Sequence, residues 1–154
     1  MKYTILFLVV INSFLLVSCF GLRNSQYTIQ QGVFGQVVWV QGNMMPSPDS
    51  PTRGNGNPVQ RTIKIYAQTT ANQVNGEAPL YTKINTKLIK TVKSDRNGNY
   101  QAKLLPGKYS LFVVEEDGKL FANSFDAEGL IAAIEVKANE VATFNIKINY
   151  KAYY

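Results

Sequence analysis

From residue 32 to the C-terminus, apolar and polar residues alternate with a period of two, and no stretch keeps helical spacing over three turns. This alternation constrains the fold more than any other feature, because a strand with that period turns one face to a core and the other to water. Gly, Asn and Pro interrupt the alternation at intervals of about ten residues, as is typical of turns between short strands. The sequence therefore predicts an all-β fold, an antiparallel β-sandwich of about seven or eight strands.

The expected strands occupy residues 33–41, 59–69, 80–93, 99–105, 108–115, 119–125, 131–137 and 141–150. The last of these has the clearest alternation. Its apolar side chains are Phe144, Ile146, Ile148 and Tyr150. Its polar side chains are Asn145, Lys147, Asn149 and Lys151. We expect the first set to face the core and the second set to face water.

The N-terminal segment follows a different pattern. After Lys2, Tyr3 and Thr4, the apolar run from Ile5 to Val17 is interrupted only by Asn12 and Ser13, and the next charged residue is Arg23. A cationic start and an apolar stretch of about a dozen residues are typical of a secretory signal peptide, here residues 1–18. An uncleaved transmembrane helix is the alternative, since residues 3–22 are long enough to span a bilayer.

The end of this run resembles the lipobox of bacterial lipoproteins, with Leu16, Val17 and Ser18 before Cys19. The resemblance implies that Cys19 is diacylated on its sulfur and becomes the first residue of the mature chain. Phe20, and not Asp, follows Cys19, which fits an outer-membrane protein facing the periplasm. Residues 19–31 then form a tether, and residues 32–154 form one domain. Lys2 is the only charge lost on cleavage, so the net charge falls from +6 to +5.

The composition excludes several functions. The chain has no His, which rules out His-based triads and His-ligated metal sites, and one Cys, which rules out an intramolecular disulfide. Glu115, Glu116 and Asp117 lie at a turn, where we expect them to be solvated. We therefore predict no enzymatic activity, no metal and no cofactor. The lysines are expected to be dispersed over the surface, with mild attraction to anionic lipid or polysaccharide and no nucleic-acid partner.

Two turns carry a family resemblance. Asp95-Arg96-Asn97-Gly98-Asn99-Tyr100 contains an Asn-Gly pair that favours a two-residue hairpin, and Leu105-Pro106-Gly107-Lys108-Tyr109 follows it. Together they resemble the carboxypeptidase regulatory-like domain, a transthyretin-like (prealbumin) sandwich. The resemblance implies an accessory domain rather than a peptidase, and the zinc ligands of the peptidase itself would require His. The Leu105-Pro106-Gly107 turn between two alternating segments also predicts that residues 99–105 and 108–115 pair as neighbouring strands.

The most distinctive loop is residues 42–58, which contain four of the six prolines. Asn43, Met44, Met45 and Arg53 are the candidate residues for contacts with a partner, and a surface loop without a ligand is the alternative. Trp39 is expected in the core. The sequence thus predicts a lipid-anchored, non-catalytic interaction module of the cell envelope, whose partner is an envelope protein or a glycan. Glycan or peptidoglycan binding through the loop is the second hypothesis, and a small exported hydrolase is the third.

Overall fold

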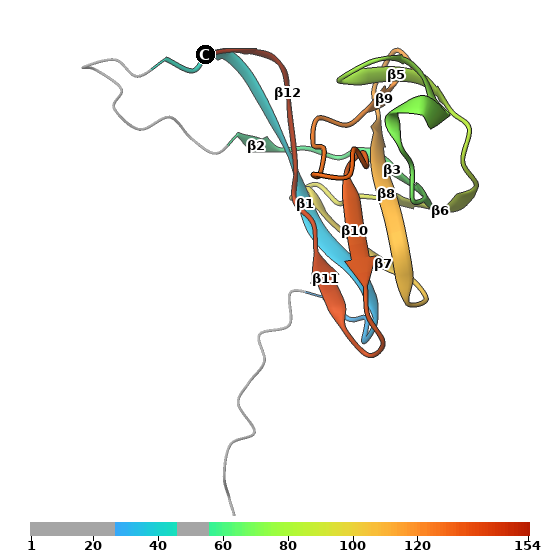
Figure 1. Cartoon of the computed structure of the whole chain (residues 1–154). Coiled ribbons are helices and arrows are strands. Elements are labelled where there is room, and N and C mark those ends of the chain that lie inside the picture. Colours follow the sequence, from blue (N-terminus) through green and yellow to red (C-terminus); the bar gives the residue numbers. More distant parts are fainter. Residues whose placement is uncertain (1–26, 46–55) are drawn as a thin grey trace, which may run out of the picture.

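The computed structural model describes residues 27–45 and 56–154, which form two β-sheets packed face to face (Figure 1). The predicted all-β sandwich is confirmed, and each of the eight expected ranges overlaps at least one strand. One sheet contains β1, β2, β7, β11 and β12, and the other contains β3, β4, β5, β6, β8, β9 and β10. The signal segment, Leu16, Val17, Ser18, Cys19 and Arg53 lie outside the described residues.

The strands of the first sheet are β1 (Gly32–Asn43), β2 (Asn57–Pro58), β7 (Asn99–Lys103), β11 (Val141–Thr143) and β12 (Ile146–Tyr153). Those of the second are β3 (Thr62–Ala67), β4 (Val74–Glu77), β5 (Leu80–Ile84), β6 (Leu88–Lys93), β8 (Gly107–Val114), β9 (Leu120–Phe121) and β10 (Ala133–Val136). A 3₁₀ turn, η2 (Ala71–Gln73), precedes β4. Neither η2 nor β4 is among the predicted elements, because residues 69–79 lack an apolar alternation.

β1 is the central strand of the first sheet. It pairs with β11 and then β12 on one side, both in parallel, and with β7 and β2 on the other side, both antiparallel. The sheet is therefore mixed at its centre, whereas every strand pair of the second sheet is antiparallel. The expected pairing of residues 99–105 with residues 108–115 is wrong, since β7 pairs with β1 and β8 pairs with β3, β9 and β10.

The main core lies between the sheets. β1 contributes Val33 and Val37, β3 contributes Ile63 and Ile65, and all four are fully buried. β12 completes the core from its inner face with Ile146 and Ile148, while the lysines at positions 147 and 151 are exposed, as the alternation predicts. Burying side chains of this size contributes about 1.5–3 kcal/mol each, so the interface between the sheets is the principal source of stability.

A second apolar cluster lies on the opposite face of the larger sheet. It surrounds Phe112, which is fully buried and makes edge-on contacts with Tyr66 and Tyr81 at centroid distances of 5.7 and 5.9 Å. Thr69 holds the covering segment in place, because its N–H donates to Ser110 Oγ at 3.1 Å and its carbonyl accepts from Ile131 N. The larger sheet is thus buried on both faces over part of its area.

The Asp95–Gly98 turn differs from the expected hairpin. The Gly98 N–H donates to the Asp95 carbonyl, so Arg96 and Asn97 are the central residues, and of the expected Asn-Gly pair only Gly98 has a positive φ, of +76°. The turn joins β6 of one sheet to β7 of the other. Asp95 Oδ1 accepts hydrogen bonds from the N–H groups of Asn97 and Asn99, both at 2.8 Å. A Cβ at Gly98 would lie 2.3 Å from the Val37 carbonyl oxygen, so glycine is needed here for close approach as well as for its backbone angle.

Candidate binding site at one end of the sandwich

A depression of about 450 Å³ opens where the far end of β1 and β12 meets the turn after β8. Its lining residues come from five segments that are distant in the sequence: Trp39, Gln41, Arg61, Leu80, Glu115, Glu116, Asp117, Tyr150 and Lys151. In Figure 1 these segments lie toward the top of the view, at the end of the sandwich opposite the point where β1 begins. The depression combines aromatic, cationic and anionic side chains.

A β-bulge brings two consecutive side chains of β12 into this depression. Two steps along β1, from Trp39 to Gln41, are matched by three along β12, from Ile148 to Lys151. Both Tyr150 and Lys151 consequently line the depression, although regular alternation would place them on opposite faces. Bulges commonly redirect side chains next to functional sites.

Trp39 and Tyr150 form the aromatic part of the site. Their ring centroids are 5.4 Å apart with the planes at 90°, an edge-on arrangement that aromatic pairs prefer. The Arg61 guanidinium carbon lies 5.8 Å from the Trp39 centroid, and Lys151 Nζ lies 5.6 Å from it, both within cation–π range. Trp39 is half-buried and packs against the core, so the prediction that it belongs to the core describes only one side of the ring.

Glu115 is the buried charge of the site, with only 3% of its side chain exposed. Tyr150 donates its hydroxyl to Glu115 Oε2 at 2.9 Å, and Arg61 Nε donates to Glu115 Oε1 at 3.4 Å. The expectation that Glu115 is solvated is therefore wrong. The Tyr150 phenol and the Arg61 guanidinium replace water as the partners of this carboxylate.

The same contacts make the Tyr150 phenol a weaker acid than usual. Burial, followed by the hydrogen bond and the negative charge of Glu115, raises the pKa of Tyr150 to about 12. Outside this pair the charges are more accessible, since the Glu116 carboxylate, which lies 3.6 Å from Arg61 Nη2, is almost fully exposed. The Lys119 backbone N–H lowers the pKa of Asp117 by donating to its carboxylate, with a further contribution from the Lys119 side chain.

The arrangement suits the recognition of a polar ligand with a flat apolar face. Trp39 and Tyr150 supply aromatic surface, while Gln41, Glu116 and Lys151 supply donors and acceptors around it. Both Glu115 oxygens accept from Arg61 and Tyr150, so the buried carboxylate holds the aromatic ring and the guanidinium in place. Such a carboxylate is a positioning group rather than a free base.

Of the loop residues that we predicted from the sequence, Asn43, Met44 and Met45 follow Gln41 along the chain, and Arg53 lies outside the described residues. Asn43 is the last residue of β1, so the loop begins later than residue 42, and residues 57–58 form β2. Met44 donates its N–H to the Tyr153 carbonyl at 2.7 Å, and Met45 donates its N–H to Asn43 Oδ1 at 2.8 Å. Met45 is 56% exposed, which leaves its side chain available for contacts.

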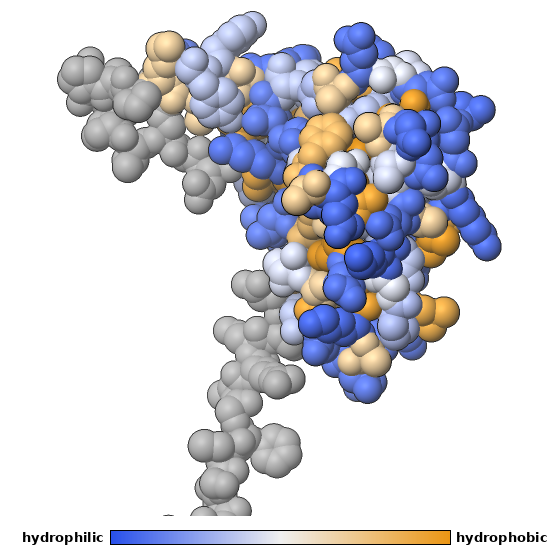
Figure 2. Space-filling model, viewed as in Figure 1, coloured by the Kyte–Doolittle hydropathy of each residue, from blue (hydrophilic) through white to orange (hydrophobic). Residues whose placement is uncertain are grey.

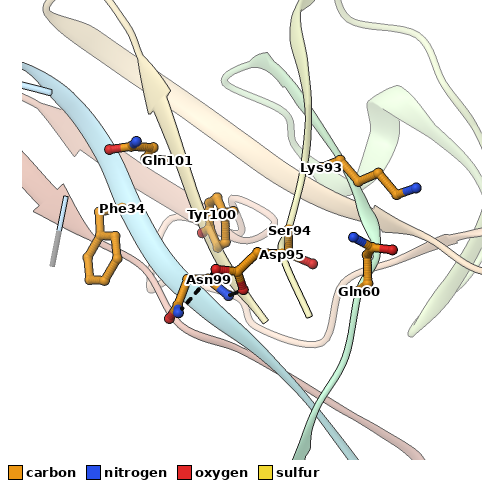
Figure 3. Close-up of a pocket in the computed structure, with 8 residues that line it drawn as sticks. All are labelled: Phe34, Gln60, Lys93, Ser94, Asp95, Asn99, Tyr100 and Gln101. Carbon is orange, nitrogen blue, oxygen red and sulfur yellow. Dashed lines mark hydrogen bonds between the residues drawn. The ribbon is translucent and has the colours of Figure 1, made fainter. Parts of the chain in front are cut away.

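A second depression of similar volume lies where β6 and β7 meet (Figure 3). Figure 3 shows Asp95 and Asn99 beside Tyr100, with Lys93 and Gln60 across the opening. Asp95 is engaged by its own turn, and Tyr100 donates its hydroxyl to the Phe144 carbonyl at 2.6 Å. Burial raises the pKa of Tyr100 far above its usual range. These groups support the fold, and the two aromatic side chains that line this depression, Phe34 and Tyr100, are both buried.

Sequence reasoning missed the site because its members are unremarkable individually. Arg61 precedes β3, Leu80 begins β5 and Glu115 follows β8, so only the tertiary fold brings them to Trp39. The available signal was the run of three acidic residues directly after a buried strand.

Within residues 27–45 and 56–154, no group of three or more His, Cys, Asp and Glu side chains is placed to hold a metal ion. The same residues include no helix long and apolar enough to cross a membrane.

No protein-family model and no curated protein matches this sequence. Among solved structures, a 9R-lipoxygenase from Cyanothece PCC8801 aligns with a TM-score of 0.37 and 12% identity, over 94% of this chain and 20% of the lipoxygenase. The chain thus spans about a fifth of the length of that protein.

Proposed function

We propose that the protein is a non-catalytic binding module, held on the bacterial cell envelope through an acylated Cys19 after cleavage of residues 1–18. It presents a transthyretin-like sandwich of the carboxypeptidase regulatory-like type, on an outer membrane and facing the periplasm. The observation that carries the binding role is the depression around Trp39 and Tyr150. It lies at the far end of β1, whereas the tether joins the near end, so the depression would point away from the membrane.

The membrane anchor has a direct test. Cells grown with a fatty-acid probe should label the wild-type chain and leave Cys19→Ala unlabelled. Equal labelling of both chains, or no label on the wild type, would contradict acylation at Cys19 and favour the uncleaved helix or a free chain.

A glycan of the cell wall is the ligand class that the site favours most. Sugar rings stack on aromatic side chains and take hydrogen bonds at their rims, and the depression offers both kinds of contact. Lys151 is exposed and lies over the Trp39 ring, so a stacked sugar would displace its ammonium. One feature argues against glycan hydrolysis, which requires a free pair of carboxylates: both Glu115 oxygens are occupied by donors.

Binding to purified peptidoglycan sacculi tests this proposal. Trp39→Ala should reduce retention about 5- to 150-fold, since stacking on one aromatic ring contributes roughly 1–3 kcal/mol. Phe125→Ala is the matched control, because Phe125 is 50% exposed and belongs to no described part of the depression. Equal retention of the wild type and Trp39→Ala would exclude the depression as the glycan site. Release of soluble sugar fragments from the sacculi would instead support the hydrolase.

The 42–58 loop is tested separately. Deletion of residues 46–55 shortens the loop without removing any residue of β1 or β2. If the loop contributes to binding, retention on sacculi should fall in this variant. Adding Trp39→Ala to the deletion should then remove the retention that remains. Unchanged retention would assign binding to the depression alone.

A further inference from the structure

The positive charge of this chain is concentrated in one part of the sequence. Residues 83–108 contain seven basic side chains and one acidic one: Lys83, Lys87, Lys90, Lys93, Arg96, Lys103, Lys108 and Asp95. This surplus of six equals the net charge of the whole chain, so the remaining residues are neutral in sum. The basic residues are therefore unevenly distributed along the sequence.

The fold gathers part of this charge along one edge. β6 is the outermost strand of its sheet, and the end of β7 lies next to it, because Lys90 Nζ donates to the Lys103 carbonyl at 3.1 Å. We call the surface formed by two short segments, residues 87–90 and 103–105, the basic edge. Its solvent-facing side chains are Lys87, Leu88, Ile89, Lys90, Lys103 and Leu105. None of its three lysines forms an ion pair with any described residue.

Exposed apolar side chains lie among these lysines. Leu105 is 77% exposed, Leu88 45% and Ile89 41%. Figure 2, in the view of Figure 1, shows orange surface next to blue along the side where β6 and the turn into β8 lie. Lysines on an edge strand alone would serve to prevent edge-to-edge pairing of sheets. That role does not explain three exposed aliphatic side chains, whereas lysines mixed with aliphatic side chains suit the surface of an anionic bilayer.

The tether joins the domain at the same edge. Thr28 N–H donates to Gln101 Oε1 and Gln101 Nε2 donates to Thr28 Oγ1, both at 2.9 Å, while Gln31 Nε2 donates to the Leu104 carbonyl at 2.7 Å. These contacts flank Lys103 on β7. Cys19 precedes Tyr27 by eight residues, which reach at most about 29 Å even when fully extended. An acyl anchor at Cys19 would therefore keep the basic edge close to the bilayer.

We propose that the basic edge docks onto the anionic phospholipid bilayer that carries the anchor. The proposal rests on the anchoring of Cys19 under the proposed function. The lysines contact lipid phosphates, and Leu88, Ile89 and Leu105 enter the headgroup region. Docking at this edge fixes the domain in one orientation, with the depression at Trp39 directed away from the membrane.

A dye attached at position 105 of the acylated, full mature chain tests this docking. Acylation blocks the thiol of Cys19, so Leu105→Cys supplies the one thiol for an environment-sensitive dye. In vesicles of phosphatidylcholine with 30% phosphatidylglycerol, the dye emission should shift to the blue, and 1 M salt should reverse the shift. In pure phosphatidylcholine vesicles no shift is expected. Trp39, the only tryptophan, should not be quenched by brominated lipid, because it lies at the other end of β1.

Charge substitutions supply the matched comparison. Lys90→Gln/Lys103→Gln should lower the ratio of docked to undocked protein about 30-fold, since each lysine near an anionic surface contributes about fivefold. Lys119→Gln/Lys147→Gln removes the same charge away from the basic edge and should leave the ratio unchanged. Equal effects of the two pairs would overturn the proposal, because they would show attraction by net charge alone.

Failure of docking is distinguishable from failure of the anchor. Protein that floats with vesicles in 1 M salt, yet shows no dye shift at low salt, would be anchored without docking and would refute the basic edge. Protein that floats at low salt only, with the dye shifted, would support docking and contradict the anchor. A third outcome concerns the partner. If the dye stays exposed on vesicles, and binding to dextran sulfate requires Lys90 and Lys103, then the basic edge binds an anionic polysaccharide and the proposed docking to a bilayer is wrong.

Discussion

The hydrogen bond between Tyr150 and Glu115 should be a principal support of the candidate site, and Tyr150→Phe removes only that bond. Phenylalanine keeps the ring that contacts Trp39 and Phe121, so the packing of the site is retained. Glu115 would then rely on Arg61 Nε, which is 3.4 Å away and makes a long hydrogen bond. Hydrogen bonds to charged groups contribute about 1.5–3 kcal/mol, so we expect the free energy of unfolding to fall by about 2 kcal/mol.

Urea denaturation at neutral pH, followed by tryptophan fluorescence, measures this loss. For a domain of this size the dependence on urea is of the order of 1–3 kcal/mol per molar, so the midpoint should fall by roughly 1 M. Tyr153→Phe is the matched control on the same strand, because the Tyr153 side chain is 74% exposed, and it should change stability by less than about 0.5 kcal/mol.

A double-mutant cycle then tests whether the charge of Glu115 is responsible. In a Glu115→Gln background the remaining bond joins two neutral groups, and its net contribution falls to about 0.5–1.5 kcal/mol. The cost of Tyr150→Phe should therefore be about 1 kcal/mol smaller than in the wild type. A cost below 0.5 kcal/mol in the wild type, or the same cost in both backgrounds, would refute the argument that a buried carboxylate positions the phenol.

Three further predictions concern the same fold. The pKa of Tyr150 lies near 12 in the folded chain and near 10 when unfolded, so its stabilising contribution is complete below pH 10 and is lost between about pH 10 and 12. The stability gap between wild type and Tyr150→Phe should narrow when urea unfolding is repeated at pH 11.5, and a constant gap would contradict this. Gly35→Ala would place a Cβ 1.8 Å from the Phe144 carbonyl oxygen, and thermal unfolding should show a loss of about 3 kcal/mol. Ser110→Ala leaves the buried Thr69 N–H without its acceptor, which should cost about 1–3 kcal/mol in urea and speed hydrogen exchange at that amide.

Periodicity predicts those parts of the fold that depend on which face of a strand is apolar. The inward direction of Ile63, Ile65, Ile146 and Ile148 follows from alternation, because only one face of each strand meets the other sheet. Which strands pair with each other does not follow from alternation in the same way. The Leu105-Pro106-Gly107 turn has the same local chemistry whether its strands share a sheet or lie in different ones, and here it crosses between the sheets.

The candidate site escaped prediction for a related reason. Lys151 enters it through a bulge, which alters the alternation without a signal in residue type. Glu115 is buried because the Tyr150 phenol of β12 and the guanidinium of Arg61, the residue before β3, reach it, and no local sequence feature specifies those partners. The apolar strand around Trp39 predicts a core position, but only one side of the Trp39 ring packs against the core.

β1 relates the two proposals to each other in space. It begins at Gly32, beside the tether contacts, and passes Trp39 seven residues later, a rise of roughly 23 Å at about 3.3 Å per residue. Screening at physiological salt attenuates charge effects over about 8 Å, so the lysines of the basic edge exert little direct field on Arg61 and Glu115. The two ends are thus electrostatically separate while rigidly joined by one strand. Docking at the basic edge would therefore set the height and direction of the depression above the membrane without altering its chemistry.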